Sequence, residues 1–290
     1  MTPDQYCQNK ASESGSSFYY SFLFLAPEKR QAITALYAFC REVDDIVDET
    51  RETAIAQQKL DWWKSSMRET FAKSPSHPIQ QALLPAIERY QLPLSLFLDI
   101  IDGMEMDLTI FRYQTFDELS LYCYRVAGAV GLLSAKIFGY QDKAVENYAK
   151  SLGIAFQLTN ILRDIKEDAS RNRIYIPLQE LSDIGVTESE VLSCQYSEKM
   201  MMLLQTQIDR ARRYYREAFD YLPSRDRNEQ RCGIIMSAIY HAILEKIAEE
   251  PAQVLRGRVR ISAWKKLWLA WNAARTEKLQ KYNHSNSIKT

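Results

Sequence analysis

Apolar residues recur every three to four positions along most of this chain, which is the period of helices with one buried face. Prolines fall mainly between these segments, and none lies between Pro93 and Pro177. Pro27 begins the first long segment, where a helix does not need the missing N–H. Residues 171–183 break the period and predict a long connection. The pattern predicts helices over residues 28–48, 54–72, 77–90, 94–110, 117–138, 142–167, 188–221, 225–250 and 261–280.

The composition favours the same all-α fold. Only 9 Gly and 9 Pro occur among 290 residues, about half of ordinary usage, which argues against a turn-rich sandwich or barrel. Hydrophobic residues make up 46% of the chain, enough for a sizeable core. No repeat or linker divides the sequence. We therefore expect one all-α domain over residues 1–282 and a polar, disordered tail over residues 283–290.

The charge balance limits the classes of partner. The chain carries 37 Lys and Arg against 37 Asp and Glu, so its formal net charge is zero. A neutral chain has no overall field that would attract nucleic acid, and we expect no nucleic-acid partner.

Cysteine, histidine and hydropathy patterns restrict the location and the metal. Five scattered cysteines without a C-x-x-C pair suit a reducing cytoplasm. Three histidines without ligand spacing argue against zinc. The N-terminus does not resemble a secretory signal, and the most apolar stretch, Val126 to Leu133, is too short for a membrane anchor. These patterns predict a cytoplasmic protein.

Two of the expected helices carry polar stripes on otherwise apolar segments. In the first, Tyr37, Arg41, Asp44 and Asp48 are spaced at i, i+4, i+7 and i+11. In the second, the residues at i, i+3, i+7 and i+11 are Gln157, Asn160, Asp164 and Asp168. Each set occupies one face of a helix. We expect the two faces to line a common cavity.

Carboxylates four residues apart repel each other on a helix, so two such pairs need compensation. Oxygen ligands without His or Cys indicate Mg²⁺, which one or two carboxylates usually hold together with substrate phosphate oxygens. Arg41 and Arg163 could bind the same phosphates directly. The alternative is that these acids pair with Arg and Lys on a solvated face. The occurrence of two matched stripes favours a metal site over such a solvated face.

A third segment, Ser14-Gly15-Ser16-Ser17-Phe18, precedes an expected helix. Its small residues leave backbone N–H groups accessible, so it could close over a phosphate. An ordinary helix cap and turn explains the local sequence equally well.

These residues resemble the squalene and phytoene synthases, which are head-to-head prenyltransferases with an all-α isoprenoid-synthase fold around a central cavity. The most specific match is LGIAFQLTNILRDIKEDASRNRIYIP, residues 152–177. YCYRVAGAVGLLSAKI, residues 122–137, is a second matching block, and Asp44-Asp45-x-x-Asp48 and Gly15-Ser16-Ser17-Phe18 lie where the family has its first acidic motif and its flap. The opening of the chain is most similar to bacterial presqualene diphosphate synthases of the hopanoid route.

The resemblance implies roles for individual residues. Asp44, Asp48, Asp164 and Asp168 match the Mg²⁺ ligands. The matches to diphosphate contacts are Ser16, Ser17, Tyr37, Arg41, Gln157, Asn160, Arg163 and Tyr240. Tyr122 matches a cavity tyrosine, and Val126, Ala127, Gly128 and Gly131 would leave room for an isoprenoid tail.

The implied reaction joins two molecules of farnesyl diphosphate into presqualene diphosphate and releases diphosphate. Phytoene, dehydrosqualene or squalene are alternative products of the same family. Squalene formation needs NADPH; no G-x-G-x-x-G occurs here, and NADPH is not expected to be required. Enzymes that follow in the same pathway are possible partners.

Other classes fit less well. The second motif of terpene cyclases has an Asn/Asp, Ser/Thr and Glu triad, and Asp164-x-x-x-Asp168 followed by Ala169-Ser170 does not match it. A chain-elongating prenyltransferase is chemically nearer. A non-catalytic helical scaffold would show no dependence on Mg²⁺ or diphosphate.

The segment RGRVRISAWKKLWLAW, residues 256–271, combines Trp264, Trp268 and Trp271 at i, i+4 and i+7 with five basic residues. A basic amphipathic helix of this kind can lie on a membrane surface, here the inner face. The alternative, which apolar periodicity favours, is a last helix packed on the core.

Overall fold

The computed structural model describes residues 1–13, 21–22, 25–50 and 52–287, and side chains up to Thr276. Two predicted site residues, Ser16 and Ser17, lie outside the described residues. Within the described part the regular structure is helical, and the only β contact is a single parallel bridge between Arg112 and Ile174. The prediction of an all-α fold is therefore confirmed.

The helices follow one another along the chain with short connections. Their bounds are α1 Pro3–Glu13, α3 Pro27–Glu49, α4 Thr53–Phe71, α5 Pro78–Tyr90, α6 Leu94–Thr109, α7 Phe116–Cys123, η1 Tyr124–Gly128, α8 Ala129–Phe138, α9 Ala144–Ser170, α10 Leu178–Ile184, α11 Glu188–Leu192, α12 Glu198–Tyr221, η2 Ser224–Asp226, α13 Arg231–Glu249, η3 Pro251–Leu255 and α14 Ala263–Ser287.

Some sequence predictions were wrong in detail. Residues 188–221 do not form one helix, because Cys194 has a φ of 50° and Ser197 caps a new helix by accepting a hydrogen bond from the Met200 N–H at 3.1 Å. The expected connection over residues 171–183 contains the start of α10, and α1 was not predicted. Helices α10 and α11 have too few turns to produce a clear hydrophobic period, and α1 buries only Cys7 and Ala11.

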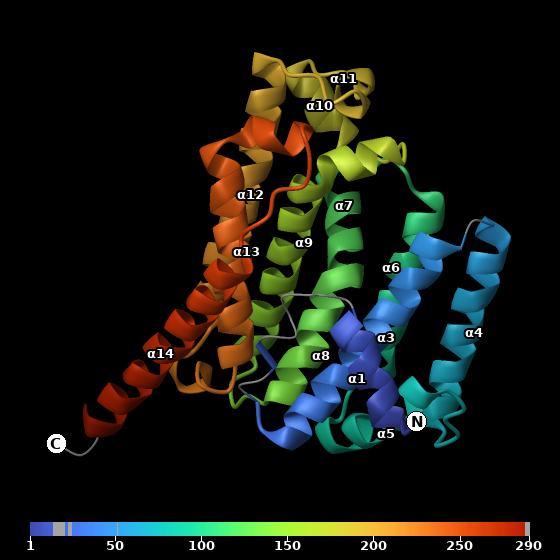
Figure 1. Cartoon of the computed structure of the whole chain (residues 1–290), viewed down its shortest axis with the longest axis vertical. Coiled ribbons are helices and arrows are strands. Elements are labelled where there is room, and N and C mark those ends of the chain that lie inside the picture. The colour runs from blue at the N-terminus through green and yellow to red at the C-terminus, as the bar shows by residue number, and fades with distance from the viewer. Residues whose placement is uncertain (14–20, 23–24, 51, 288–290) are drawn as a thin grey trace.

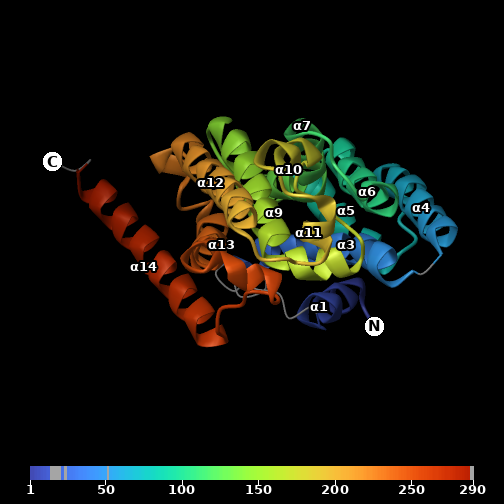
Figure 2. The same ribbon diagram turned by 90° about the horizontal axis from the view of Figure 1, so that it is seen from above.

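Helix α9 runs through the middle of the molecule (Figures 1 and 2). One apolar cluster joins α9 to α12 and α13, and a second joins α3, α4, α5 and α6. Helix α8 contributes to both, with Ala135 in the first and Leu133 and Ile137 in the second. This arrangement leaves α3 and α9 on opposite sides of a space that α8 borders.

The continuous segment α7–η1–α8 is the most hydrophobic part of the bundle. By length and composition alone, Phe116–Phe138 passes as a membrane-spanning helix, the only one among the described residues that does. The segment packs against α6 and α9 within the bundle, and the core helix of a soluble protein passes the same test. Its five-residue π turn, Tyr124–Gly128, is a feature often found beside functional sites.

Close contact between this segment and α9 depends on glycine. A Cβ on Gly153 would lie 2.4 Å from the Ala127 carbonyl oxygen and 2.9 Å from the Gly128 Cα. A Cβ on Gly131 would lie 2.4 Å from the Ala149 carbonyl oxygen. Because both obstacles are backbone atoms, a side chain at either position forces the helices apart.

We expect Gly153→Ala to lower the free energy of unfolding by about 1–3 kcal/mol, the usual cost of overpacking. Thermal unfolding followed by circular dichroism measures this change. Gly257→Ala is the matched control, because its Cβ would meet nothing within 4 Å. Equal melting temperatures for the two variants would contradict the packing argument.

Candidate active site

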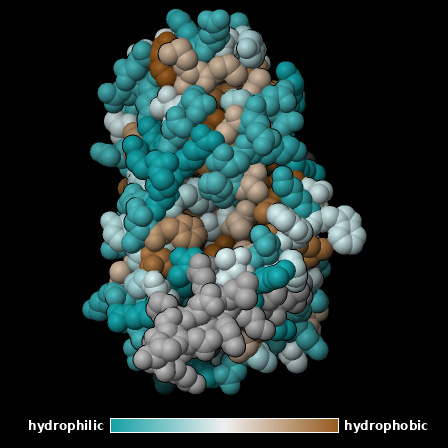
Figure 3. All heavy atoms as spheres, turned by 90° about the vertical axis from the view of Figure 1, so that its left-hand side faces the viewer, coloured by the Kyte–Doolittle hydropathy of each residue, from teal (hydrophilic) through white to brown (hydrophobic). Residues whose placement is uncertain are grey.

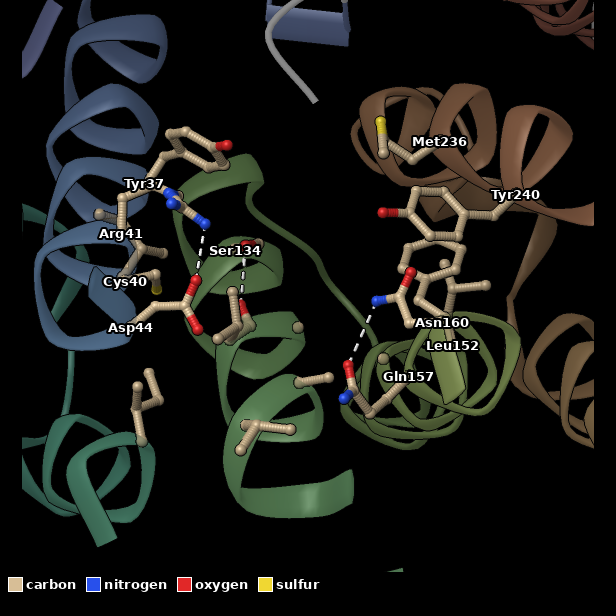
Figure 4. A pocket seen from close by; sticks show the side chains of 18 of the residues that line it. Tyr37, Cys40, Arg41, Asp44, Ser134, Leu152, Gln157, Asn160, Met236 and Tyr240 are labelled. Atoms are coloured by element: carbon tan, nitrogen blue, oxygen red, sulfur yellow. Dashed lines mark hydrogen bonds and ion pairs between the residues drawn. The ribbon is translucent and has the colours of Figure 1, made fainter. Parts of the chain in front are cut away.

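A cavity of about 530 Å³ lies between α3 and α9, with further walls from α6, α8 and α13. Figure 4 shows it from close by, with polar side chains of α3 opposite those of α9 and α13. Of the thirteen predicted site residues, the eleven that the structure describes all line it: Tyr37, Arg41, Asp44, Asp48, Tyr122, Gln157, Asn160, Arg163, Asp164, Asp168 and Tyr240.

The α3 side presents the first polar stripe. The Arg41 guanidinium donates from Nη1 to Asp44 Oδ2 at 2.6 Å and also contacts Asp45. Asp45 itself accepts from Lys10 of α1 at 2.8 Å, away from the cavity. Asp45 thus holds Arg41 from outside the cavity, whereas Asp44 and Asp48 line the cavity.

The α9 side presents the second stripe. Arg163 binds Asp164 through two parallel hydrogen bonds, Nε to Oδ1 at 2.8 Å and Nη2 to Oδ2 at 2.6 Å. One turn earlier, Asn160 Nδ2 donates to Gln157 Oε1 at 3.2 Å. The Asn160 Oδ1 atom is buried and has no hydrogen-bond partner among the described residues. A buried amide oxygen without a partner is an unmet acceptor that a bound ligand could satisfy.

Two carboxyl groups of the cavity are buried enough that their ionised forms are disfavoured. Burial raises the pKa of Asp168 to about 7, and the nearby Asp164 carboxylate adds to the rise. Burial likewise raises the pKa of Asp44 to about 6, against the opposing charge of Arg41. A cation between the two faces would favour the ionised form of both groups.

Two arginines that sequence reasoning missed neutralise part of this charge. Arg171, just beyond α9, binds Asp48 of α3 at 2.7 Å. Arg258, in the connection before α14, binds Asp164 at 3.1 Å and Glu167 at 3.4 Å. Glu167 lines the cavity together with Arg258. The basic run around Arg258 was visible in the sequence, but nothing local placed it beside α9.

A buried acid, Asp107 of α6, was also missed. It accepts hydrogen bonds from the hydroxyls of Tyr122 and Tyr175, both at 2.8 Å, and its carbonyl accepts from Arg173 at 2.9 Å. The sequence did contain a signal for it: Asp107 lies seven residues after Ile100, on the same face of an otherwise apolar helix. The network fixes the position of Tyr122 at the cavity wall.

Tyr37 and Tyr240 lie on opposite sides of the cavity with their hydroxyls turned toward one another (Figure 4). The Tyr240 ring packs on Phe156, with ring centroids 4.7 Å apart. Burial raises the pKa of Tyr240, and the positive charge of Arg163 opposes that rise.

Apolar side chains such as Leu36, Ile100 and Leu152 line much of the cavity. Of the four small residues expected to leave room for an isoprenoid tail, Val126, Ala127 and Gly131 line it as well. The fourth, Gly128, does not line the cavity. Its Cα instead lies 2.9 Å from the position that a Cβ on Gly153 would take, so it belongs to the close contact between this segment and α9.

The donor set fits Mg²⁺, although the described residues contain no group of three acidic, Cys or His side chains already placed to hold a metal. Asp44 and Asp48 face Asp164 and Asp168 across one cavity, all four offer hard oxygen atoms, and Asn160 Oδ1 is an unmet acceptor beside them. Mg²⁺ is usually bound through one or two carboxylates together with water and substrate phosphates. Such a site needs no preformed group of three.

Comparison with known proteins identifies the class. The family model for squalene/phytoene synthase matches residues 11–265. The chain is 36% identical over 274 residues to a phytoene synthase from Arthrospira platensis, covering 90% of this chain and 89% of that one. The chain therefore belongs to the squalene/phytoene synthase family, and it is a prenyltransferase-type enzyme of head-to-head condensation.

Solved structures agree with this assignment. A dehydrosqualene synthase in complex with ligand superimposes with a TM-score of 0.85 at 26% identity, covering 95% of this chain and 96% of that chain. The squalene synthase HpnC from Alicyclobacillus acidocaldarius gives 0.77 at 26% identity, with 86% and 94% covered. The fold is the isoprenoid-synthase bundle that the sequence predicted.

We expect Asp168→Asn to stabilise the protein without Mg²⁺ at pH 8 by about 1 kcal/mol, or about 2 °C in melting temperature. A carboxyl with a raised pKa in the folded state binds its proton more tightly there than when unfolded. The wild type therefore loses stability as the pH rises from about 4 through about 7, and the amide avoids that loss.

Melting curves between pH 4 and pH 8 test this prediction. Asp183→Asn, at an exposed position of α10 outside the cavity, is the control and should melt at the same temperature as the wild type at pH 8. A destabilised Asp168→Asn at pH 8 would show that the carboxylate is well compensated in the free protein.

Proposed function

We propose that the protein condenses two molecules of farnesyl diphosphate, head to head, into presqualene diphosphate with release of diphosphate. The observation that carries the proposal is that the acidic faces of α3 and α9 line the same cavity as an apolar interior. One end of the cavity suits diphosphate and metal, and the other suits prenyl chains. All five cysteines are free thiols, which supports a reducing, cytoplasmic setting.

The polar end would hold the diphosphate groups. The guanidinium groups of Arg41 and Arg163 present fork-shaped donors that match phosphate oxygens. Both are now paired with acids of their own helices, so binding of diphosphate would exchange one anionic partner for another. The amides of Gln157 and Asn160 and the hydroxyls of Tyr37 and Tyr240 add neutral donors around the same space.

Asp44, Asp48, Asp164 and Asp168 would hold Mg²⁺ together with the diphosphate oxygens. When bound, the metal neutralises charge on the departing diphosphate.

The reaction begins when the C1–O bond of the donor breaks, and the bonding electrons leave with the diphosphate. Arg41 and Arg163 stabilise that developing charge. The double bond of the second molecule attacks the allylic cation, and loss of a proton closes the cyclopropane. Apolar walls at Leu36, Ile100 and Val126 exclude water, which would otherwise capture the cation.

The nearby tyrosines are poor candidates for the base. Burial raises the pKa of Tyr122 and Tyr240 above the ordinary value of a phenol, so both remain protonated at neutral pH. Tyr122 already donates its proton to Asp107. We therefore assign the proton to the released diphosphate, and give the aromatic rings the role of facing the cation.

Asp44→Asn and Asp164→Asn should each reduce the rate of Mg²⁺-dependent diphosphate release by at least about a hundredfold, the scale of losing one electrostatic group at a reacting centre. A coupled diphosphate assay with farnesyl diphosphate measures it. Asp183→Asn, on the exposed surface of α10, is the matched control and should retain wild-type turnover. Wild-type rates in either site variant would overturn the assignment.

A second candidate product is phytoene, because the relative from Arthrospira platensis bears that name. The two candidates differ in the prenyl chain that the cavity must accept. Purified protein should therefore be incubated with Mg²⁺ and either farnesyl or geranylgeranyl diphosphate, with and without NADPH, and the products identified by mass.

We expect presqualene diphosphate from farnesyl diphosphate, with no requirement for NADPH. Conversion of geranylgeranyl diphosphate alone would replace our proposal with phytoene synthesis. Squalene that forms only with NADPH would indicate a reductive second step. Consumption of farnesyl diphosphate only together with isopentenyl diphosphate would indicate chain elongation instead.

A further inference from the structure

Helix α14 turns its largest apolar side chains away from the protein. Trp264 is 82% exposed, Trp268 57% and Trp271 55%, and Leu267 beside them is 43% exposed. These four residues share one face of the helix, which we call the tryptophan face. Burying such large side chains normally yields substantial free energy, so an exposed row of three indicates a surface that meets a partner.

Small residues, and not the tryptophans, attach α14 to the bundle. Ala270 and Ala274 are buried against the core, and Arg231 of α13 donates from Nη2 to the Ala274 carbonyl at 2.9 Å. Packing of the last helix on the core was the favoured prediction. The helix does pack there, but through Ala270 and Ala274, which lie on a different side of the helix from the exposed tryptophans.

The surroundings of the tryptophan face are strongly basic. Residues 251–275 contain Arg256, Arg258, Arg260, Lys265, Lys266 and Arg275 and no Asp or Glu. Lys265, Lys266 and Arg260 form no ion pair with any side chain that the structure describes. Lys266 lies on a different side of the helix from the tryptophans: burial lowers its pKa, as do the charges of Arg163 and Arg258, which line the cavity. Arg256 pairs with Glu250, and Arg258 pairs with Asp164 and Glu167. The exposed Lys265 and Arg260 have no such acid among the described side chains, so they favour an anionic partner.

The tryptophan face lies on the outside of a cavity wall. Helix α13, to which α14 is attached, lines the cavity with Gly233, Met236 and Tyr240, and Arg258 lines it directly. Figures 1 and 2 show α14 as the outermost helix beside α13, with its C-terminal part extending past the bundle. In the space-filling view, this side of the molecule is largely hydrophilic with scattered apolar patches (Figure 3).

We propose that the tryptophan face, together with the exposed cations Lys265 and Arg260, docks the protein on a membrane surface that contains anionic lipid. Tryptophan favours the headgroup level of a bilayer, where its ring meets apolar chains and its N–H remains in a polar layer. Lys and Arg beside it add attraction to anionic headgroups. The charges explain why lipid fits better than a second copy of this chain, whose own face would be equally basic.

Docking would place the cavity wall of α13 next to the bilayer. If the proposed function holds, an apolar product would then form beside the phase that dissolves it. The docking itself depends only on α14, so it can be tested independently of the reaction.

Vesicle sedimentation tests the proposal with the full chain. Vesicles of phosphatidylcholine alone are compared with vesicles that also contain phosphatidylglycerol, at low and high salt. We expect binding to the anionic vesicles that weakens with salt. Trp264→Ala/Trp268→Ala/Trp271→Ala should bind at least about tenfold more weakly. Arg260→Gln/Lys265→Gln should lose about fivefold per charge, since each cation near an anionic surface contributes about that factor.

Matched controls come from elsewhere on the surface. Trp62→Ala removes a tryptophan that is 46% exposed on α4, and Lys73→Gln/Lys143→Gln removes two exposed lysines. Both should bind vesicles like the wild type. Equal losses in controls and α14 variants would overturn the proposal, as would wild-type binding in the α14 variants.

Fluorescence gives a second, positional readout. Three of the five tryptophans lie in α14, so acyl-chain-brominated anionic lipid should quench the wild type and leave the triple Trp→Ala variant unquenched. Light scattering without lipid tests the competing occupant. A wild-type dimer that dissociates in the triple variant would assign the tryptophan face to a second copy and overturn lipid docking. Diphosphate release from detergent-dispersed substrate should be unchanged in the triple variant.

Discussion

The arrangement of the whole bundle depends on like charges held apart across one cavity. Two pairs of aspartates, from α3 and α9, would repel one another in a low-dielectric interior. Each helix supplies its own arginine, Arg41 or Arg163, beside its first aspartate. The segment after α9 then adds a cross-link, because Arg171 reaches Asp48 of α3. In the free protein, these arginines therefore neutralise the carboxylates that Mg²⁺ would bind.

These arginine–aspartate pairs explain why the carboxylates need not be arranged around a metal before substrate arrives. Arginines that hold Asp44, Asp48 and Asp164 are also the groups best shaped for phosphate. Arrival of diphosphate with Mg²⁺ would let each arginine move from carboxylate to phosphate, and each carboxylate from arginine to metal. Asp168 would also favour a cation, because burial and the nearby Asp164 carboxylate raise its pKa in the free protein.

Sequence periodicity predicted the fold and the two cavity-lining stripes because both follow from local helix geometry. Positions such as Asp44 and Asp164 are fixed by their spacing once the helix is correct. Arg258 could not be predicted in the same way, because it reaches Asp164 from a connection almost a hundred residues later. Asp107 was recoverable as an acid on an apolar helix, yet its two tyrosine partners come from separate segments. The break at Cys194 depends on one backbone conformation that composition does not reveal.

Helix α14 shows where hydrophobic periodicity stops being informative. A period of tryptophans and a period of alanines coexist on the same helix, and the pattern alone favours burying the larger set. The bundle instead packs Ala270 and Ala274, because small side chains allow α14 to approach α13 closely enough for Arg231 to reach the helix backbone. The larger tryptophan side chains are left outside the bundle, and the exposed Lys265 directly follows Trp264. Exposed tryptophans with the cations Lys265 and Arg260 near them suit the surface of an anionic bilayer.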